Sequence, residues 1–207
     1  MTRRNLWLWA FLAGGIVLLT AIRPLLRHEP EPPPILGMLP AFSLIDRDGR
    51  TFGSEELKGQ VYITSFFFSR CPSICPLLMK SMKRLDDAYS ERGIAGIRLV
   101  SITVDPEHDD PARLRAYATE IGADPARWTL LTGDLEAIRR LAFDGFHVPV
   151  GEPQALAGEL LDIAHSGKLV LVDGKGAIRG YYDADESGLD EVYNRAQQVL
   201  READATL

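Results

Sequence analysis

One segment constrains the fold of this 207-residue chain more than any other: an apolar run at residues 61–68 that leads into a pair of cysteines. The run is uncharged and rich in β-branched and aromatic residues, which predicts a buried central strand. Cys71 and Cys75 are the only cysteines in the sequence, and Pro76 opens a predicted helix over residues 76–92. The segment therefore predicts a strand that delivers both cysteines to the N-terminus of a helix.

The other hydrophobic patterns alternate between strands and helices. They predict strands at 97–104 and 128–131, helices at 111–121, 134–143 and 189–202, β-hairpins at 42–52 and 168–182, and an irregular stretch at 145–161. The crossover from 61–68 to 97–104 should be parallel and right-handed. This order predicts an α/β, thioredoxin-like fold with an N-terminal β-hairpin, a central mixed sheet and flanking helices. The cysteines would then lie at the carboxyl end of a central strand, where open α/β sheets bind ligands.

The N-terminal residues differ from the rest of the chain. An uncharged apolar run at 6–22 reaches the lower limit for a membrane span and exceeds the apolar core of a cleaved signal peptide. We expect a membrane anchor over residues 1–23, a proline-rich tether over 24–38 and one folded domain over 39–207. Arginines flank the apolar run on both sides, so the positive-inside rule does not decide which end of the anchor faces the cytoplasm. The sequence lacks an Arg- and Ser-rich transit peptide, which favours a bacterial inner membrane.

Charge and cysteine content argue against two classes of protein. The formal net charge is −6, which disfavours nucleic acid as a partner. Two cysteines are too few for a disulfide-stabilised scaffold.

The position and spacing of Cys71 and Cys75 favour reactive chemistry. A helix N-terminus stabilises thiolate over thiol, and thiolate is the form that binds metal or attacks a disulfide. A separation of four residues on a helical turn places both sulfurs on one face. The pair can therefore close a disulfide or share one soft cation. The alternative is two buried structural cysteines.

A histidine supplies a third candidate ligand. His165 precedes the strand expected at 168–172, and in a thioredoxin-like sheet the loop before that strand lies beside the cysteine turn. Two thiolates and one imidazole suit Cu(I), zinc or related soft metals. Of the other histidines, His147 is either a lining residue or a structural one, and His108 lies in a polar loop where we expect it to be solvated.

Asp105 and two methionines complete the candidates. Asp105 ends the strand at 97–104, where it could support the metal loop or cap the following helix. Met79 and Met82 follow the cysteines in the helix, and core packing is the expected role of both.

Rival chemistries fit this pattern less well. Thioredoxin-type oxidoreductases separate their cysteines by two residues, whereas three separate Cys71 from Cys75. The residues before Cys71 do not match the threonine-containing peroxiredoxin pattern. Structural zinc requires four ligands, and three plausible ones are visible in the sequence.

Four motifs within residues 39–200 resemble those of the Sco/SenC family. In chain order they are Phe66-Phe67-Phe68-Ser69-Arg70-Cys71-Pro72-Ser73-Ile74-Cys75-Pro76, Ser101-Ile102-Thr103-Val104-Asp105-Pro106-Glu107, Trp128-Thr129-Leu130-Leu131-Thr132-Gly133 and Asp162-Ile163-Ala164-His165-Ser166. An N-terminal anchor with a short tether is also the family arrangement.

The resemblance implies a copper-binding, thioredoxin-fold protein that faces the periplasm from a bacterial inner membrane. Members of the family help to assemble the dinuclear copper site of cytochrome c oxidase. By match, Cys71, Cys75 and His165 would be the copper ligands, and Asp105 a supporting residue. The implied partners are the copper-site subunit of the oxidase and a periplasmic copper donor or thiol reductant.

Three positions depart from the family pattern. Arg70 stands where histidine is common, and Ser73 and Ala164 stand where acidic residues are common. These departures bear on copper affinity more than on ligand identity. Two functions stay open: a membrane-anchored copper chaperone, or a thiol-disulfide oxidoreductase that reduces the cysteines of the oxidase copper site. A redox or copper sensor is a third reading, which the lack of an appended output domain disfavours.

Overall fold

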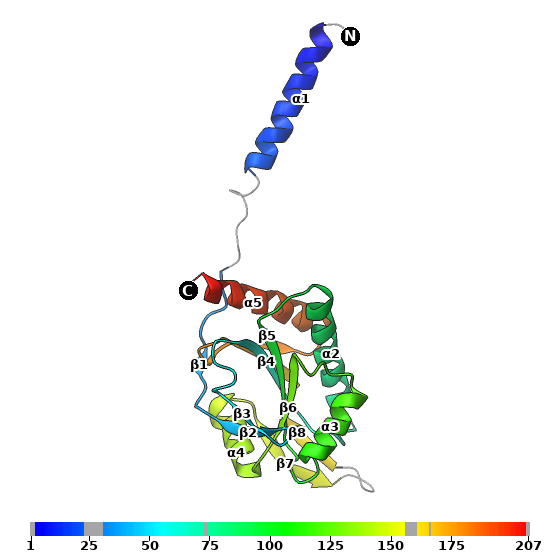
Figure 1. Cartoon of the computed structure of the whole chain (residues 1–207), viewed down its shortest axis with the longest axis vertical. Coiled ribbons are helices and arrows are strands. Elements are labelled where there is room, and N and C mark those ends of the chain that lie inside the picture. The colour runs from blue at the N-terminus through cyan, green and yellow to red at the C-terminus, as the bar shows by residue number, and fades with distance from the viewer. Residues whose placement is uncertain (1–2, 23–30, 73, 156–160, 166, 206–207) are drawn as a thin grey trace. The chain divides into compact units, whose positions relative to one another are not determined.

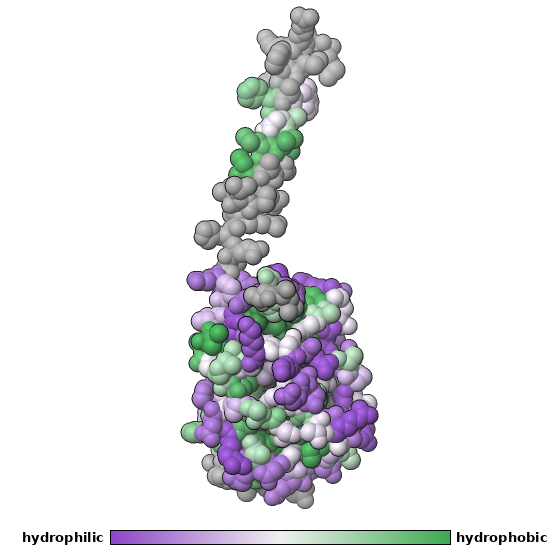
Figure 2. All heavy atoms as spheres, turned by 60° about the vertical axis from the view of Figure 1, so that its left-hand side comes forward, coloured by the Kyte–Doolittle hydropathy of each residue, from purple (hydrophilic) through white to green (hydrophobic). Residues whose placement is uncertain are grey.

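The computed structural model describes residues 3–22, 31–72, 74–155, 161–165 and 167–205. The chain divides into two compact units, Met1–Glu31 and Pro32–Leu207. The first unit contains α1 (Arg3–Ile22), whose described side chains are exposed and largely hydrophobic (Figure 2). No helix in the described part of the chain has the length and apolar character needed to cross a membrane.

The second unit is built around an eight-stranded mixed sheet with the order β1-β10-β9-β4-β5-β6-β2-β3 (Figure 1). Its strands are β1 (Gly37–Met38), β2 (Ser43–Asp46), β3 (Thr51–Gly53), β4 (Val61–Phe67), β5 (Ile97–Thr103), β6 (Trp128–Thr132), β9 (Lys168–Val172) and β10 (Ala177–Asp183). β7 (Val150–Ala155) and β8 (Leu161–His165) form a separate antiparallel pair. The helices are α2 (Cys75–Glu91), α3 (Pro111–Glu120), α4 (Leu135–Arg140), which continues as the π-helix η1 (Leu141–Gly145), and α5 (Glu186–Asp204).

β4 forms the centre of the sheet and leads directly to the cysteines. It pairs in parallel with β5, and all seven of its residues are buried because protein covers both faces of the sheet. Successive side chains point to opposite faces. Phe66 meets Phe146 edge to face with ring centroids 5.3 Å apart, while Phe67 stacks on Tyr117 of α3 at 5.5 Å. The predicted parallel pairing and the thioredoxin-like α/β fold are confirmed.

The two predicted hairpins share one turn chemistry. In the β2–β3 turn, Asp46 Oδ1 accepts the backbone N–H of Asp48 at 2.8 Å and that of Arg50 at 2.9 Å. In the β9–β10 turn, Asp173 Oδ1 makes the equivalent pair of bonds, both at 2.9 Å. A glycine with positive φ, Gly49 or Gly176, ends each turn. The local sequence therefore specifies both hairpins.

The expectation of an irregular stretch at 145–161 was wrong, because this stretch contains β7 and the first residue of β8. Pro153 conceals the strand in the sequence, since proline cannot donate to a ladder and usually argues against a strand. The pairing accommodates it with a register shift between Val150 and Pro153. The preceding helix also ends in the π-turn η1 rather than in a regular α-helical turn.

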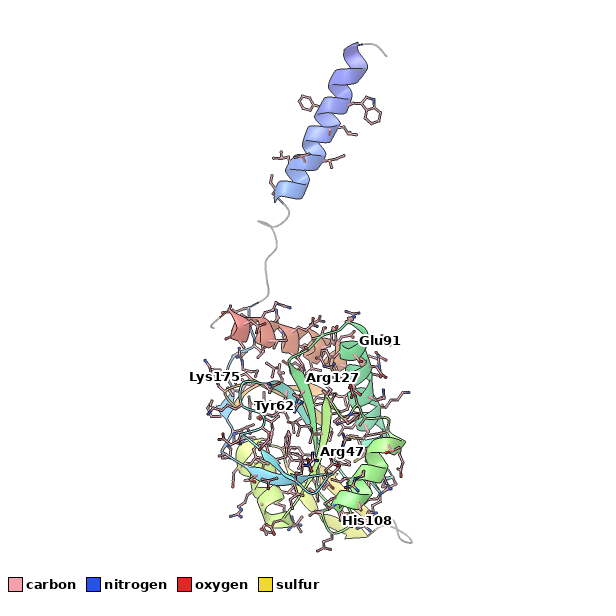
Figure 3. All side chains as sticks on the ribbon, in the orientation of Figure 1. Arg47, Tyr62, Glu91, His108, Arg127 and Lys175 are labelled. Carbon is pink, nitrogen blue, oxygen red and sulfur yellow. The ribbon has the colours of Figure 1, made fainter. Side chains whose placement is uncertain are left out.

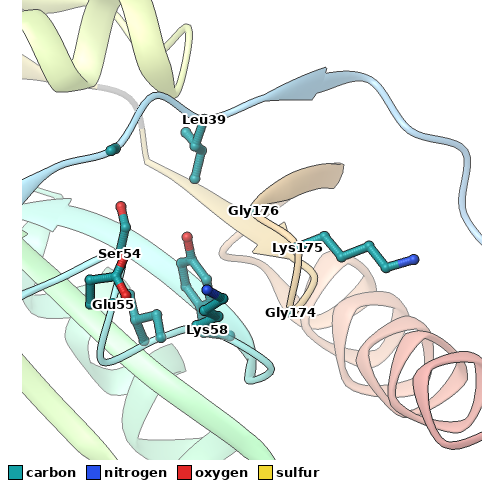
Figure 4. A pocket seen from close by; sticks show the side chains of 10 residues that line it. Leu39, Ser54, Glu55, Lys58, Gly174, Lys175 and Gly176 are labelled. Carbon is teal, nitrogen blue, oxygen red and sulfur yellow. The ribbon is translucent and has the colours of Figure 1, made fainter. Parts of the chain in front are cut away.

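Residues 32–38, which were expected in the tether, belong to the second unit and are bonded to its other elements. β1 pairs with β10, and the backbone carbonyl of Pro33 accepts hydrogen bonds from Arg179 Nε at 2.9 Å and Nη2 at 2.7 Å. After this segment, Leu39 and Ala41 line a pocket of about 320 Å³ together with the loop before β4 and the β9–β10 turn (Figure 4). No cysteine or histidine lines this pocket, so the candidate site lies elsewhere.

Candidate metal and redox site at the carboxyl edge of the sheet

The cysteine loop connects the end of β4 to the start of α2. The Cys71 backbone N–H donates to the Phe68 carbonyl at 3.2 Å, which turns the chain after the strand. Helix α2 begins at Cys75, and its N-cap residue Ile74 has no side-chain oxygen that could accept a hydrogen bond from the first turn. The Cys75 backbone N–H donates instead to Cys71 Sγ at 3.4 Å, so sulfur takes the place of a capping oxygen. The predicted placement of the pair at a helix N-terminus is confirmed, with the helix starting one residue earlier than expected.

Both cysteines are buried thiols, with Cys71 8% exposed and Cys75 1% exposed. Burial raises the pKa of Cys75 far above its ordinary value, and a hydrogen bond to the Phe68 backbone opposes this rise. The Cys71 side chain and the negative charge of Asp109 raise the pKa further. The expected thiolate at the helix N-terminus is therefore not favoured at Cys75, where desolvation outweighs the helix terminus. A cation that binds this sulfur must displace its proton.

Asp105 forms an ion pair beside the cysteine loop. Its carboxylate, 8% exposed, accepts a 2.7 Å hydrogen bond from Nε of Arg70, the residue that precedes Cys71. This bond is the largest of the contributions that raise the pKa of Arg70. The helix-cap alternative fails, because the cap of α3 is Asp110, whose Oδ1 accepts the Arg113 backbone N–H at 2.7 Å.

Asp109 is a site residue that the sequence analysis missed. It lies in the loop judged to be polar and solvated, yet its exposure is 0%. Its carboxylate binds the backbone N–H and the hydroxyl of Ser69, and also the hydroxyl of Thr103. Its neighbour His108 is exposed at the end of the domain opposite Glu91 (Figure 3). The sequence carries no signal that separates the buried aspartate from the exposed ones beside it.

His165 is described only through its backbone. It ends β8, where it pairs with Val150 of β7, and its side chain lies outside the described residues. Gly167 packs directly against the cysteine loop, since a methyl group added there would lie 2.6 Å from Ile74 Cδ1. The segment that follows His165 and the loop that carries Cys71 are therefore in contact. Among the described side chains, no cluster of three or more His, Cys, Asp or Glu residues could hold a metal.

The remaining candidates lie away from the cysteine loop or in the core. His147 has a φ of 53°, unusual for a residue other than glycine, and lines a separate pocket with Phe143, Asp144 and Pro149. Met79 and Met82 are buried in the hydrophobic core, as expected.

Comparison with known families identifies the chain. The SCO1/SenC family model matches residues 35–201. The chain belongs to this family. Among relatives, a putative copper-binding protein of Stutzerimonas stutzeri is 33% identical over 162 residues, covering 78% of this chain and 76% of the relative. The SCO1 protein homolog of Bacillus subtilis is 29% identical over 195 residues, covering 93% of this chain and 91% of the relative.

Solved structures of SCO1/SenC proteins have the same fold. A family lipoprotein from Bacillus anthracis superposes with a TM-score of 0.73 at 27% identity, over 82% of this chain and 99% of that one. Yeast Sco1 with copper bound gives a TM-score of 0.65 at 26% identity, over 78% of this chain and 89% of that one. BsSco superposes with a TM-score of 0.72 at 25% identity, over 82% of this chain and 98% of that one. It is a member of the Sco family of cytochrome c oxidase assembly proteins in which a disulfide switch has been identified.

Proposed function

We propose that this protein is a copper chaperone that binds copper through Cys71, Cys75 and His165 and assists assembly of the dinuclear copper site of cytochrome c oxidase. The observation that carries the proposal is a buried cysteine pair at a helix N-terminus, with the segment after His165 packed against it. Copper is the cargo. The copper-binding and copper-bound relatives support this choice of metal.

The donor set fits a soft cation. Both sulfurs lie in a site with little water, and thiolates select Cu(I) among the available metals. Since the Cys75 thiol keeps its proton in the absence of a cation, binding at this sulfur releases a proton. Arg70, which precedes Cys71, is held in an ion pair by Asp105. Transfer to the oxidase subunit would proceed by exchange of these ligands.

The test is an anaerobic Cu(I) titration of the reduced full-length protein in detergent against a competing chelator. We expect binding of one copper, lost in Cys71→Ser and weakened in His165→Ala. His108→Ala is the matched control, because this histidine is exposed at the same end of the domain and should not affect the affinity. Unchanged affinity and unchanged oxidase assembly in His165→Ala would exclude this ligand set.

A thiol-disulfide oxidoreductase is the second candidate function, favoured by the disulfide switch described for BsSco. In this reaction the Cys71–Cys75 dithiol passes two electrons and two protons to a disulfide of the oxidase subunit, and a Cys71–Cys75 disulfide forms. It needs only the two cysteines. Two results together would favour this function over the first. His165→Ala would keep full activity in reducing the copper-site peptide, and the wild-type protein would bind copper weakly.

The proposal places the protein on a bacterial inner membrane, anchored through residues 1–23, with its domain in the periplasm. The exposed apolar residues of α1 and the lipoprotein relative support attachment to a membrane. A copper donor or thiol reductant in the periplasm would be a further partner. Alkaline extraction of membranes tests the anchor: the full chain should stay in the pellet, and a chain without residues 1–31 should not. Release of the full chain would remove the anchor from the proposal.

A further inference from the structure

The hydrogen bonds around Asp109 all point toward its carboxylate. Arg113 Nε donates to Ser69 Oγ at 3.1 Å, so the Ser69 hydroxyl can donate onward to Asp109 Oδ1. Likewise the Asp105 backbone N–H donates to Thr103 Oγ1 at 3.1 Å, and this hydroxyl donates to Asp109 Oδ2 at 2.6 Å. The Ser69 backbone N–H donates to the same oxygen at 2.9 Å. The Asp109 carboxylate accepts three bonds in all, from the Ser69 backbone N–H, the Ser69 hydroxyl and the Thr103 hydroxyl.

These bonds join two segments that are distant in sequence. Ser69 lies two residues before Cys71, while Thr103 is the last residue of β5. Two of the three bonds to Asp109 come from Ser69, one through its backbone and one through its side chain. The carboxylate therefore fixes both the path of the chain and one side chain at the start of the cysteine loop.

Beside this attachment, the cysteine loop is held by the Arg70–Asp105 ion pair and by the contact of Ile74 with Gly167. Its described tip residues Pro72 and Ile74 are exposed. Cys71 bonds back to Phe68 and accepts the Cys75 N–H, so its position follows from the turn before it and the helix after it. A shift at Ser69 would move Cys71 while α2 held Cys75 in place. The distance between the two sulfurs would then change.

We propose that Asp109 is a positioning residue for the cysteine pair: through Ser69 it anchors the turn before Cys71 to the end of β5 and so sets the separation of the two sulfurs. The inference rests on the proposed role of the pair in binding or exchange. Its test, however, needs no copper. A wild-type protein that failed to bind copper would overturn the proposed chaperone and leave this inference standing.

The measurement is the equilibrium constant for forming the Cys71–Cys75 disulfide against a glutathione buffer, with the full chain in detergent and no metal. Loosening the turn lowers the effective concentration of one thiol at the other. We expect Ser69→Ala to lower the constant about tenfold, which makes the potential about 30 mV less negative. Thr103→Val should act in the same direction with a smaller effect. Asp109→Asn keeps the shape and one acceptor oxygen, and should fall between wild type and Ser69→Ala.

The matched control is Ser65→Ala. It removes a buried 2.8 Å hydroxyl hydrogen bond to Ser101 between the same two strands, away from the cysteine loop. Urea unfolding should show a similar loss of stability for Ser65→Ala and Ser69→Ala, and only Ser69→Ala should change the disulfide constant. Equal constants in these two variants would overturn the proposal. So would a shift in Asp109→Asn without one in Ser69→Ala, because charge rather than attachment would then be responsible.

Discussion

Two buried charged clusters lie at opposite ends of β4, and they are built differently. At the amino end, Arg179 is 6% exposed and binds Asp173 at 3.0 Å, Glu202 at 2.6 Å and the Pro33 carbonyl. At the carboxyl end, Asp109 is held by two hydroxyls and a backbone N–H, and the Arg113 guanidinium reaches it only through Ser69. One buried ion has direct counterions, while the described partners of the other are neutral.

The Arg179 cluster therefore bears on the stability of the domain, and the Asp109 cluster bears on the chemistry of the cysteine site. A buried cation with two carboxylates and a carbonyl is compensated locally and ties three distant segments together. A buried carboxylate with neutral partners is satisfied in hydrogen bonding but keeps its electrostatic effect on its surroundings. That effect reaches the Cys75 thiol, where burial is the main cause of the raised pKa and Asp109 adds to it.

The largest expected effect is at the amino end. Arg179→Met removes the cation that all members of the cluster share and leaves Asp173 buried without it, so the free energy of unfolding should fall by about 3–5 kcal/mol. Urea denaturation measures it. The control is Arg84→Met, which breaks an exposed pair with Glu186 and should change stability little. Equal losses in the two variants would show that burial of the Arg179 cluster contributes nothing.

A truncation separates the roles of the segments that Arg179 joins. Deleting residues 1–38 removes β1 and the Pro33 carbonyl, and the lost charged hydrogen bonds should cost about 2 kcal/mol. Deleting residues 1–31 keeps both and should leave the free energy of unfolding unchanged. The two truncated chains are compared by thermal and urea unfolding. An unchanged free energy of unfolding for the chain that begins at residue 39 would show that β1 and the Pro33 carbonyl do not stabilise the domain.

High pH should weaken both ends through a buried tyrosine at each. Burial raises the pKa of Tyr62, with Asp173 adding to it, and burial also raises that of Tyr117, with Cys75 and Asp109 adding to it. In the unfolded chain these phenols ionise near pH 10, so above this pH the folded state binds more protons and its stability falls. Each tyrosine should contribute a fall of about 1.4 kcal/mol per pH unit. Tyr62→Phe and Tyr117→Phe should each make the measured slope shallower, and an unchanged slope would contradict the assignment.

The smallest effect distinguishes satisfied from unsatisfied hydroxyls on the two central strands. Thr103→Val removes one donor to Asp109 Oδ2, which keeps the Ser69 N–H, and should cost about 1 kcal/mol. The Thr64 hydroxyl on β4 is buried without a hydrogen-bond partner among the described residues. Thr64→Val should therefore be neutral or slightly stabilising in urea denaturation. A comparable loss in both would indicate that valine packs poorly in this sheet rather than that the Asp109 bond stabilises it.

Much of the site was predictable because its signals are local. The apolar run of β4 and Pro76 at the start of α2 are read within one segment, and they place Cys71 and Cys75 correctly. Aspartate and glycine at fixed turn positions likewise specify both hairpins of the main sheet. The sequence analysis missed β7 because Pro153 argues against a strand, and the register shift that accommodates it is visible only in the structure.

The sequence by itself determined most elements of the main sheet and its helices, the cysteine pair at a helix N-terminus and the family, because period, turn chemistry and motif spacing act over a few residues. Only the tertiary structure decided which charged residues are buried and what holds them. Ser69 and Asp109 are 40 positions apart, and Pro33 and Arg179 are 146 apart. No local pattern encodes such pairs, because the closure of the sheet brings them together. The same closure buries Cys75 and so raises the pKa of its thiol.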